Sequence, residues 1–143
     1  MKKKVVKALL FYKDSGKYHL LLLERAKQLF HGMEDLPGGK LEAGELPIPG
    51  LIREIKEETQ LDVNQLLHVA THEWEGPDGT HYLEYLYCAL INTKKVIPNP
   101  DEHSSFRWVA LEHLESSKIH PKIKELILAH MSRIEALLFD NQK

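Results

Sequence analysis

The sequence predicts an α/β domain in which a mixed β-sheet lies between helical layers. Three features of the chain indicate this class. Apolar and β-branched runs of strand length are separated by turn-forming residues, an amphipathic helical segment lies between two pairs of such runs, and a second helical segment closes the chain. Strands that flank helices in this order are typical of layered α/β domains.

Length and composition limit the class of protein. A chain of 143 residues is long enough for a real core, so we expect a single domain over residues 1–143. The formal net charge of −2 provides no basic field that would draw the chain to nucleic acid or to acidic membranes. The single cysteine, Cys88, excludes an internal disulfide. No segment approaches the roughly 20 apolar residues that span a bilayer, and no signal-peptide pattern opens the chain, so we expect a cytoplasmic protein.

The first pair of strands is expected near the N-terminus. Residues 4–12 and 18–24 are apolar runs, and a cluster of turn-forming residues, Lys13-Asp14-Ser15-Gly16, separates them. The two runs therefore predict a hairpin. Residues 29–34 are expected to form a loop that leads into a turn at Gly38-Gly39.

The second pair of strands is expected after a central helix. Residues 66–74 and 80–91 flank the strong turn signal Gly76-Pro77-Asp78-Gly79, which predicts a second hairpin. Residues 94–105 are polar and contain two prolines, so they are expected to be a loop. Residues 106–111 then form a short predicted strand.

Two helices are predicted, one central and one at the end of the chain. The central helix should begin near Pro47 and Pro49, which fit only in a first turn, and run over residues 47–59. The last helix is expected over residues 121–139 as one amphipathic segment. Its inner side is predicted to carry Ile123, Leu126, Ile127, Ile134, Leu137 and Leu138.

The central helix carries an acidic stripe beside an apolar one. At about 100° per residue, Glu54, Glu57 and Glu58 share one face. The neighbouring apolar stripe is formed by Ile48, Leu51, Ile52 and Ile55. The apolar stripe should fix the helix on a core, so that the glutamates are held at a cleft. Arg53, one turn before Glu57, can pair with that carboxylate. Gly50, on the acidic face, leaves room for a ligand or for a close loop.

Three glutamates this close repel one another and weaken a bare helix, which suggests that a cation binds them. All-oxygen ligands favour a hard cation, Mg²⁺ or Mn²⁺. Most glutamate-rich helices are only solvated faces, so the glutamates alone do not decide between the two interpretations.

The wider pattern around the helix is far more restrictive, and it resembles the Nudix box. The matching positions are Leu36-Pro37-Gly38-Gly39, Glu45, Arg53-Glu54, Glu57-Glu58 and Leu61. The resemblance implies a Nudix-type α/β/α sandwich. One position departs, because Gln60 stands where the family usually has glycine. Either glutamine ends the helix in a left-handed conformation, at a cost of about 1 kcal/mol, or the helix ends differently.

The resemblance also implies an activity. The family cleaves compounds in which a nucleoside diphosphate is linked to another group, with Mg²⁺ or Mn²⁺ as cofactor. The compact chain favours a small nucleotide substrate, a nucleoside triphosphate or an oxidised deoxynucleoside triphosphate, which would yield a nucleoside monophosphate and pyrophosphate. ADP-ribose and dinucleoside polyphosphates remain alternative substrates. Pro77 lies near the place where a proline is associated with ADP-ribose hydrolysis, but the glycine-rich turn explains it equally well.

Carried over residue by residue, the resemblance makes Glu54, Glu57 and Glu58 metal ligands and catalytic residues. A backbone carbonyl of the Gly38-Gly39 turn, with Gly39 as the ligand, would also reach the metal. Arg53 and Glu45 are expected to be a supporting pair that holds the glycine loop against the helix. The general base is open between a box glutamate and an acid from a distant loop, for which Glu102 is the candidate.

Substrate contacts are less well defined. Arg25 ends the second predicted strand, where the resemblance suggests a phosphate contact; a surface salt bridge is the alternative. Gly38 and Gly39 would contact substrate through their backbone. Phe30 and His31 are candidates for the base pocket or for loop packing, and His103 is either functional or an ordinary loop histidine.

A non-catalytic module of the same fold that senses a nucleotide is the rival hypothesis. Such proteins tend to lose box glutamates or the arginine, and all of them are present here. In either case the expected partner is a small-molecule nucleotide. The exposed apolar runs of the first hairpin would permit a homodimer.

Overall fold

The computed structural model describes residues 2–26 and 33–141. Within these ranges the strands form one mixed sheet with the order β3-β2-β1-β6-β5, in which β4 also pairs with β1 and β7 also pairs with β2. The strands are β1 Lys3–Asp14, β2 Lys17–Arg25, β3 Glu34–Asp35, β4 Gly38–Lys40, β5 Leu67–Glu75, β6 His81–Leu90 and β7 His103–Ala110.

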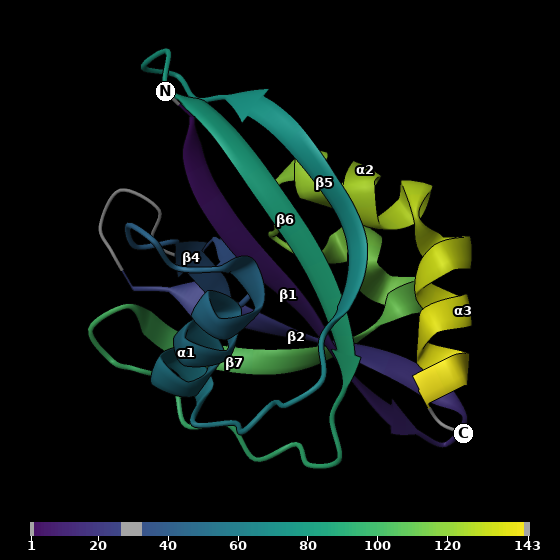
Figure 1. Cartoon of the computed structure of the whole chain (residues 1–143). Coiled ribbons are helices and arrows are strands. Elements are labelled where there is room, and N and C mark those ends of the chain that lie inside the picture. The colour runs from purple at the N-terminus through teal and green to yellow at the C-terminus, as the bar shows by residue number, and fades with distance from the viewer. Residues whose placement is uncertain (1, 27–32, 142–143) are drawn as a thin grey trace.

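Helices cover both faces of the sheet. One face is covered by α1, and the other by α2 and α3, with a short 3₁₀ helix before them (Figure 1). The helices are α1 Pro47–Thr59, the 3₁₀ helix Leu111–Ser116, α2 Pro121–Ala129 and α3 Met131–Asn141. The predicted α/β class, with a mixed sheet between helical layers, is confirmed.

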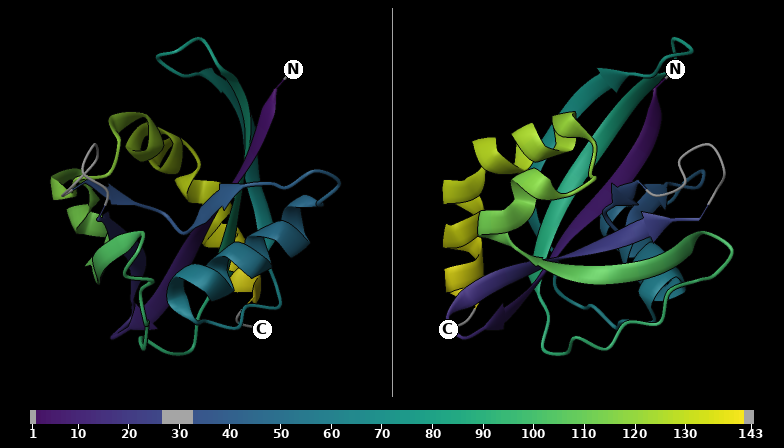
Figure 2. Two further views of the ribbon diagram at one scale, coloured as in Figure 1. Left: turned by 90° about the vertical axis from the view of Figure 1, so that its left-hand side faces the viewer. Right: turned by 180° about the vertical axis from the view of Figure 1, so that it is seen from behind.

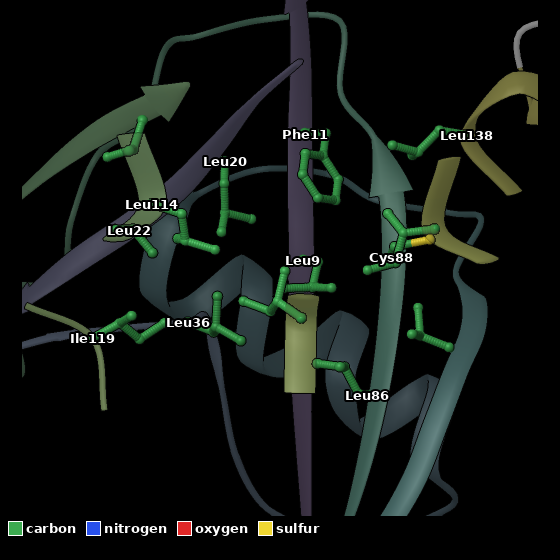
Figure 3. Packing of buried hydrophobic residues seen from close by; sticks show 14 residues of the cluster. Leu9, Phe11, Leu20, Leu22, Leu36, Leu86, Cys88, Leu114, Ile119 and Leu138 are labelled. Carbon is green, nitrogen blue, oxygen red and sulfur yellow. The ribbon is translucent and has the colours of Figure 1, made fainter. Parts of the chain in front are cut away.

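Two apolar cores lie on the two faces of the sheet. Alternate residues of β1 supply both cores: Leu9 and Phe11 face α2 and α3, whereas Ala8 and Leu10 face α1. Figure 3 shows the first core, where Leu86 and Cys88 of β6 lie close to residues of β1 and of the C-terminal helices. The alternation explains why the strand reads as a continuous apolar run.

Strand β1 lies at the centre of the sheet. On one of its sides, two different strands pair with successive parts of β1. Its first half pairs antiparallel with β4, from Val5 with Lys40 to Lys7 with Gly38. Its second half pairs antiparallel with β2 from Phe11 onward, while β6 runs parallel along its other side. Figure 2 shows how the strands diverge around β1. This division brings β4 and the following helix α1 to the middle of the sheet.

Several predicted elements are confirmed. Strands β1 and β2 form the first hairpin, and β5 and β6 form the second. Helix α1 begins and ends at the predicted residues. The inner side of the C-terminal segment is as expected, because Ile127, Ile134 and Leu138 are fully buried in the first core.

Three predictions are wrong in detail. The expected turn at Gly38-Gly39 is strand β4, which lies so close to β1 that a Cβ atom on Gly38 would be 2.0 Å from the Val6 carbonyl oxygen. Strand β7 begins at His103, inside the expected loop, because it pairs with β2 as far as Arg25. The expected single C-terminal helix is interrupted at His130, so that α2 and α3 are separate helices that pack on the same core.

Candidate functional site

Helix α1 is fixed by its apolar side and presents its acidic side to β4. Leu51 and Ile55 are fully buried in the second core. Gly50 faces the loop before the helix, where a Cβ atom would lie 2.4 Å from Leu41 and 2.9 Å from Glu45. Of the two explanations for this glycine, the close loop is the one that the structure shows. The helix is thereby held between the sheet and the loop.

Two of the three glutamates meet in a shielded position. The side chain of Glu58 is almost wholly buried and that of Glu54 is largely so, and the two carboxyl groups are close enough to influence each other's ionisation. Burial raises the pKa of Glu58 above its ordinary value against the opposing charge of Lys7, and burial also raises the pKa of Glu54. Ionising both carboxyl groups at once is costly in this position. A bound hard cation would offset that cost.

Glu57 lies on the same face but points elsewhere. Its side chain is 54% exposed and pairs with the Arg53 guanidinium at 3.2 Å. Among residues 2–26 and 33–141, no three acidic, histidine or cysteine side chains already converge as a ligand set. The structure therefore brings the carboxyl groups of Glu54 and Glu58 together, whereas the side chain of Glu57 pairs with Arg53 instead.

The glycines of β4 lie against the buried carboxyl groups. A Cβ atom on Gly39 would lie 2.8 Å from the Glu54 carboxyl carbon. The backbone N–H of Gly38 donates a hydrogen bond to Glu58 Oε2 at 3.3 Å. Main-chain atoms of β4 thus reach the carboxyl pair directly, because neither residue has a side chain in the way. The carboxyl oxygens of this pair are the kind of donor that a divalent cation such as Mg²⁺ prefers.

Arg53 connects the loop to the acidic face. Its guanidinium donates to Glu45 Oε2 at 2.7 Å and to Glu45 Oε1 at 3.0 Å, and its Nη2 lies 3.2 Å from Glu54 Oε1. Glu45 also accepts the backbone N–H of Glu42 at 2.9 Å. The hydrogen bonds from Arg53 and Glu42 lower the pKa of Glu45 to about 2. The Arg53–Glu45 contact expected from the sequence is present, while its part in catalysis stays a prediction.

The end of α1 has the left-handed geometry, which is one of the two alternatives for Gln60. Gln60 has φ of 64° and ψ of 13°, and its backbone N–H donates to the Lys56 carbonyl at 3.0 Å. The glutamine therefore ends the helix in the conformation for which glycine is the usual residue.

The loop that carries Glu102 is docked on the end of α1. The backbone N–H of Asn99 donates to the carbonyl of Glu58 at 3.3 Å, and that of Glu102 donates to the carbonyl of Asn99 at 3.1 Å. The carbonyl of Glu102 accepts the N–H of Ala26 at 2.9 Å, at the end of β2. The loop thus lies beside the acidic face, and the Glu102 side chain is exposed to solvent. Its role as a base stays a prediction.

His103, the residue after Glu102, is the first residue of β7 and pairs in register with Arg25 of β2. It is only 8% exposed, and its Nδ1 has no hydrogen-bond partner in the described part of the chain. Burial lowers the pKa of this imidazole. The histidine is a packed residue of β7, and the expected loop position was wrong.

Arg25 makes the salt bridge that was the alternative to a phosphate contact. Its Nη1 lies 2.9 Å from Asp35 Oδ2, and the Lys7 ammonium lies 3.0 Å from the same oxygen. Lys7 and Asp35 were not among the predicted site residues. The signal for Lys7 was available, since it is the one charge inside an otherwise apolar run of strand length. Phe30 and His31 lie outside the described residues.

No helix in the described part of the chain combines the length and the apolar character needed to cross a membrane.

Known proteins share both the sequence pattern and the fold. The family model described as NUDIX domain matches residues 1–130. The phosphatase NudJ of Escherichia coli strain K12 is 31% identical over 101 residues, which cover 67% of this chain and 65% of NudJ. The chain thus spans just under two thirds of the length of this curated relative.

Two solved structures have similar folds. The MutT protein from Methanosarcina mazei Go1 matches with a TM-score of 0.78 and 23% identity, covering 92% of this chain and 94% of that one. The NUDIX domain of Shewanella oneidensis NrtR, in complex with ADP ribose, matches with a TM-score of 0.77 and 20% identity, covering 92% and 89%. The family model matches most of the sequence, and these structures show the same fold. The chain therefore belongs to the NUDIX domain family.

Proposed function

We propose that this chain is a metal-dependent pyrophosphohydrolase that cleaves a nucleoside triphosphate or an oxidised deoxynucleoside triphosphate into a nucleoside monophosphate and pyrophosphate. The observation that carries the proposal is the shielded Glu54–Glu58 pair, which lies against the side-chain-free backbone of Gly39. A carboxyl pair of this kind is costly for the fold without a cation, which argues that binding is its purpose.

Glu54, Glu57, Glu58 and the backbone of Gly39 would hold Mg²⁺ or Mn²⁺. Bound there, the ion would offset phosphate charge, polarise a phosphoryl oxygen and lower the pKa of a bound water. Members of this family generally require a divalent metal ion. The Glu57 carboxylate is exposed and paired with Arg53, and in this proposal it leaves Arg53 when the ion binds.

The remaining residues have orienting and binding roles in this proposal. Arg53 holds Glu45 and thereby the loop before α1, which supports the position of β4. The backbone of Gly38 and Gly39 and the guanidinium of Arg25 are proposed to contact the substrate phosphates. The base that takes the proton of the attacking water is either a box glutamate or Glu102.

Substrates other than triphosphates have weaker support. The association of a proline with ADP-ribose hydrolysis would apply to Pro77. That residue lies in a hairpin turn closed by hydrogen bonds from Gly76 N–H to Thr80 O at 2.8 Å and from Gly79 N–H to Gly76 O at 3.0 Å. The turn accounts for the proline without a ligand.

The proposal is tested by turnover of a nucleotide panel with Mg²⁺. The panel contains ordinary and oxidised nucleoside triphosphates, ADP-ribose and diadenosine polyphosphates. Pyrophosphate release is read with added pyrophosphatase, and phosphomonoester products of the other compounds are read with added phosphatase. We expect triphosphates to be the best substrates and chelation to abolish turnover without unfolding the protein.

Two variants accompany the panel. Glu58→Gln removes a proposed ligand, and Glu112→Gln removes a carboxylate of an exposed pair with Lys17 far from the acidic face. Turnover should be lost only in Glu58→Gln. No turnover of any compound by the wild-type chain, with nucleotide binding retained, would instead establish a sensing module.

A further inference from the structure

The buried carboxylate of Asp35 lies between two cations. Its Oδ2 lies 3.0 Å from Lys7 Nζ and 2.9 Å from Arg25 Nη1. Its Oδ1 accepts the backbone N–H of Leu36 at 2.7 Å. Burial opposes ionisation of Asp35, but the Lys7 charge and these hydrogen bonds outweigh it and keep its pKa below the ordinary value. Asp35 is therefore a fixed anion that joins β1, β2 and β3.

The three charged side chains differ in their access to solvent. Lys7 and Asp35 are each 14% exposed, whereas Arg25 is 32% exposed. Two partners are thus fixed inside the protein, and Arg25 is the member that reaches outward. The trio carries one net positive charge, so it offers an anionic ligand a favourable field.

This cluster adjoins the proposed catalytic face. Lys7 pairs in register with Gly38, and the charge of Lys7 acts on Glu58. Arg25 lies opposite His103, and the next residue of β2, Ala26, hydrogen-bonds to Glu102. Arg25 therefore lies between Asp35 of β3 and the start of β7, next in sequence to Glu102.

We infer that Asp35 is a positioning residue, which holds the Arg25 guanidinium in the orientation that binds the phosphate chain of the substrate. This inference rests on the proposed function. An arginine fork binds phosphate through two parallel N–H groups, so its orientation matters as much as its charge. Without the carboxylate, Lys7 and Arg25 would also repel each other, and Arg25 is the more exposed of the two side chains.

The test is a double-mutant cycle on the triphosphate that the wild-type protein hydrolyses best. Asp35→Asn keeps the shape of the side chain and removes its charge. We expect KM to rise about tenfold with kcat nearly unchanged, because a charge-assisted contact made to the bound substrate is weakened. Arg25→Ala should raise KM by at least as much.

The decisive comparison is made in the Arg25→Ala background. There, Asp35→Asn should change KM by less than about twofold, since the group on which it acts is absent. Asp14→Asn is the matched control, because it removes an exposed aspartate that pairs with Lys94 on the surface. A purely structural role for Asp35 predicts instead the same fold-change in both backgrounds, and that result would overturn the inference.

A second variant covers the case in which Asp35→Asn does not fold. Lys7→Met combined with Asp35→Asn removes both buried charges together, so that no unpaired buried charge remains. It should fold and show the same rise in KM as Asp35→Asn alone. A wild-type KM in this folded variant would also overturn the inference. Absence of wild-type turnover on every nucleotide would overturn the proposed function, and this inference with it.

Discussion

Single residues decide how closely the main chain can approach the acidic side of α1. Gly39 is the clearest case, because its α-carbon lies against the Glu54 carboxyl group. Elsewhere in the fold, the buried carboxylate of Glu34 joins β3 to Arg107 of β7 and to the backbone of Lys118. The effect of each can be measured by one substitution.

Gly39→Ala should strongly reduce turnover while the protein stays folded. The added methyl group would stand 2.8 Å from the Glu54 carboxyl carbon, so the carboxyl group must move. Misplacement by about 1 Å can lower a rate about a hundredfold. Gly16→Ala is the control, since nothing lies within 4 Å of the added atom there, and its φ of 79° gives alanine a backbone strain that Gly39 does not share. Equal turnover of the two variants would contradict the close approach.

Glu34→Gln should lower stability near neutral pH and much less in acid. Glu34 accepts hydrogen bonds from Arg107 at 2.6 and 2.8 Å and from the Lys118 backbone at 2.8 Å, and those from Arg107 hold its pKa below the ordinary value. A carboxyl group with a lowered folded pKa stabilises the fold above its unfolded pKa, and this contribution is lost as pH falls through the folded pKa.

Urea unfolding at pH 7 and at pH 3.5 measures the effect of Glu34. At pH 7 the wild-type protein should exceed the variant by about 2 kcal/mol in free energy of unfolding. That difference should shrink in the acid measurement, below the unfolded pKa of about 4.3 for glutamate. A difference that is the same at both pH values would show that charge on Glu34 is not its source.

At the level of elements, helix α1 was predictable because several local signals agree. Two prolines mark its start, the apolar stripe marks the face that packs on the core, and the acidic stripe marks the face turned toward β4. The Arg53–Glu45 contact was implied by the resemblance of this segment to the Nudix box, and the structure contains it. Strand β4 was not predictable in this way, because its pairing with β1 is a long-range contact that leaves no local pattern in three residues.

The remaining errors have the same kind of cause. The interruption at His130 falls within a continuous amphipathic pattern, and packing of both helices on one core decides it. Asp35 was missed because a lone aspartate before a glycine pair looks like a loop residue. The role of Asp35 depends on its ion pairs with Lys7 of β1 and Arg25 of β2, which are long-range contacts.

Gln60→Gly should stabilise the protein by up to about 1 kcal/mol, because glutamine is held at a φ of 64° at the end of α1. The extra freedom of glycine in the unfolded chain offsets part of the gain. Gln60→Ala is the matched comparison, since alanine lacks the same side chain but keeps the backbone strain. Thermal unfolding of both variants measures the effect, and equal melting temperatures would exclude strain at this position.

For the whole molecule, the exposed edge of the sheet is the main feature. Strand β5 ends the strand order, so its outer edge has no strand beside it in the described part of the chain. Arg133 of α3 lies over part of this edge and donates to the carbonyl oxygens of His68 at 2.9 Å and Val69 at 3.0 Å. An arginine that occupies edge carbonyls hinders the pairing of β5 with another chain.

Arg133→Ala should therefore promote self-association. Sedimentation velocity over a range of concentrations should give a larger mass for the variant than for the wild-type protein. Glu135→Ala is the control, because it changes an exposed residue of the same helix. If the variant keeps the wild-type mass at every concentration, the arginine does not protect the edge.

The parallel pairing of β1 with β6 has a consequence for the order of folding. Lys3 pairs with Tyr82, so the centre of the sheet joins segments that lie more than half the chain apart. Closing so long a loop is slow compared with forming the two local hairpins. During synthesis the β1–β2 hairpin therefore leaves the ribosome with one side of β1 unpaired. That side is covered only when the second hairpin has been made.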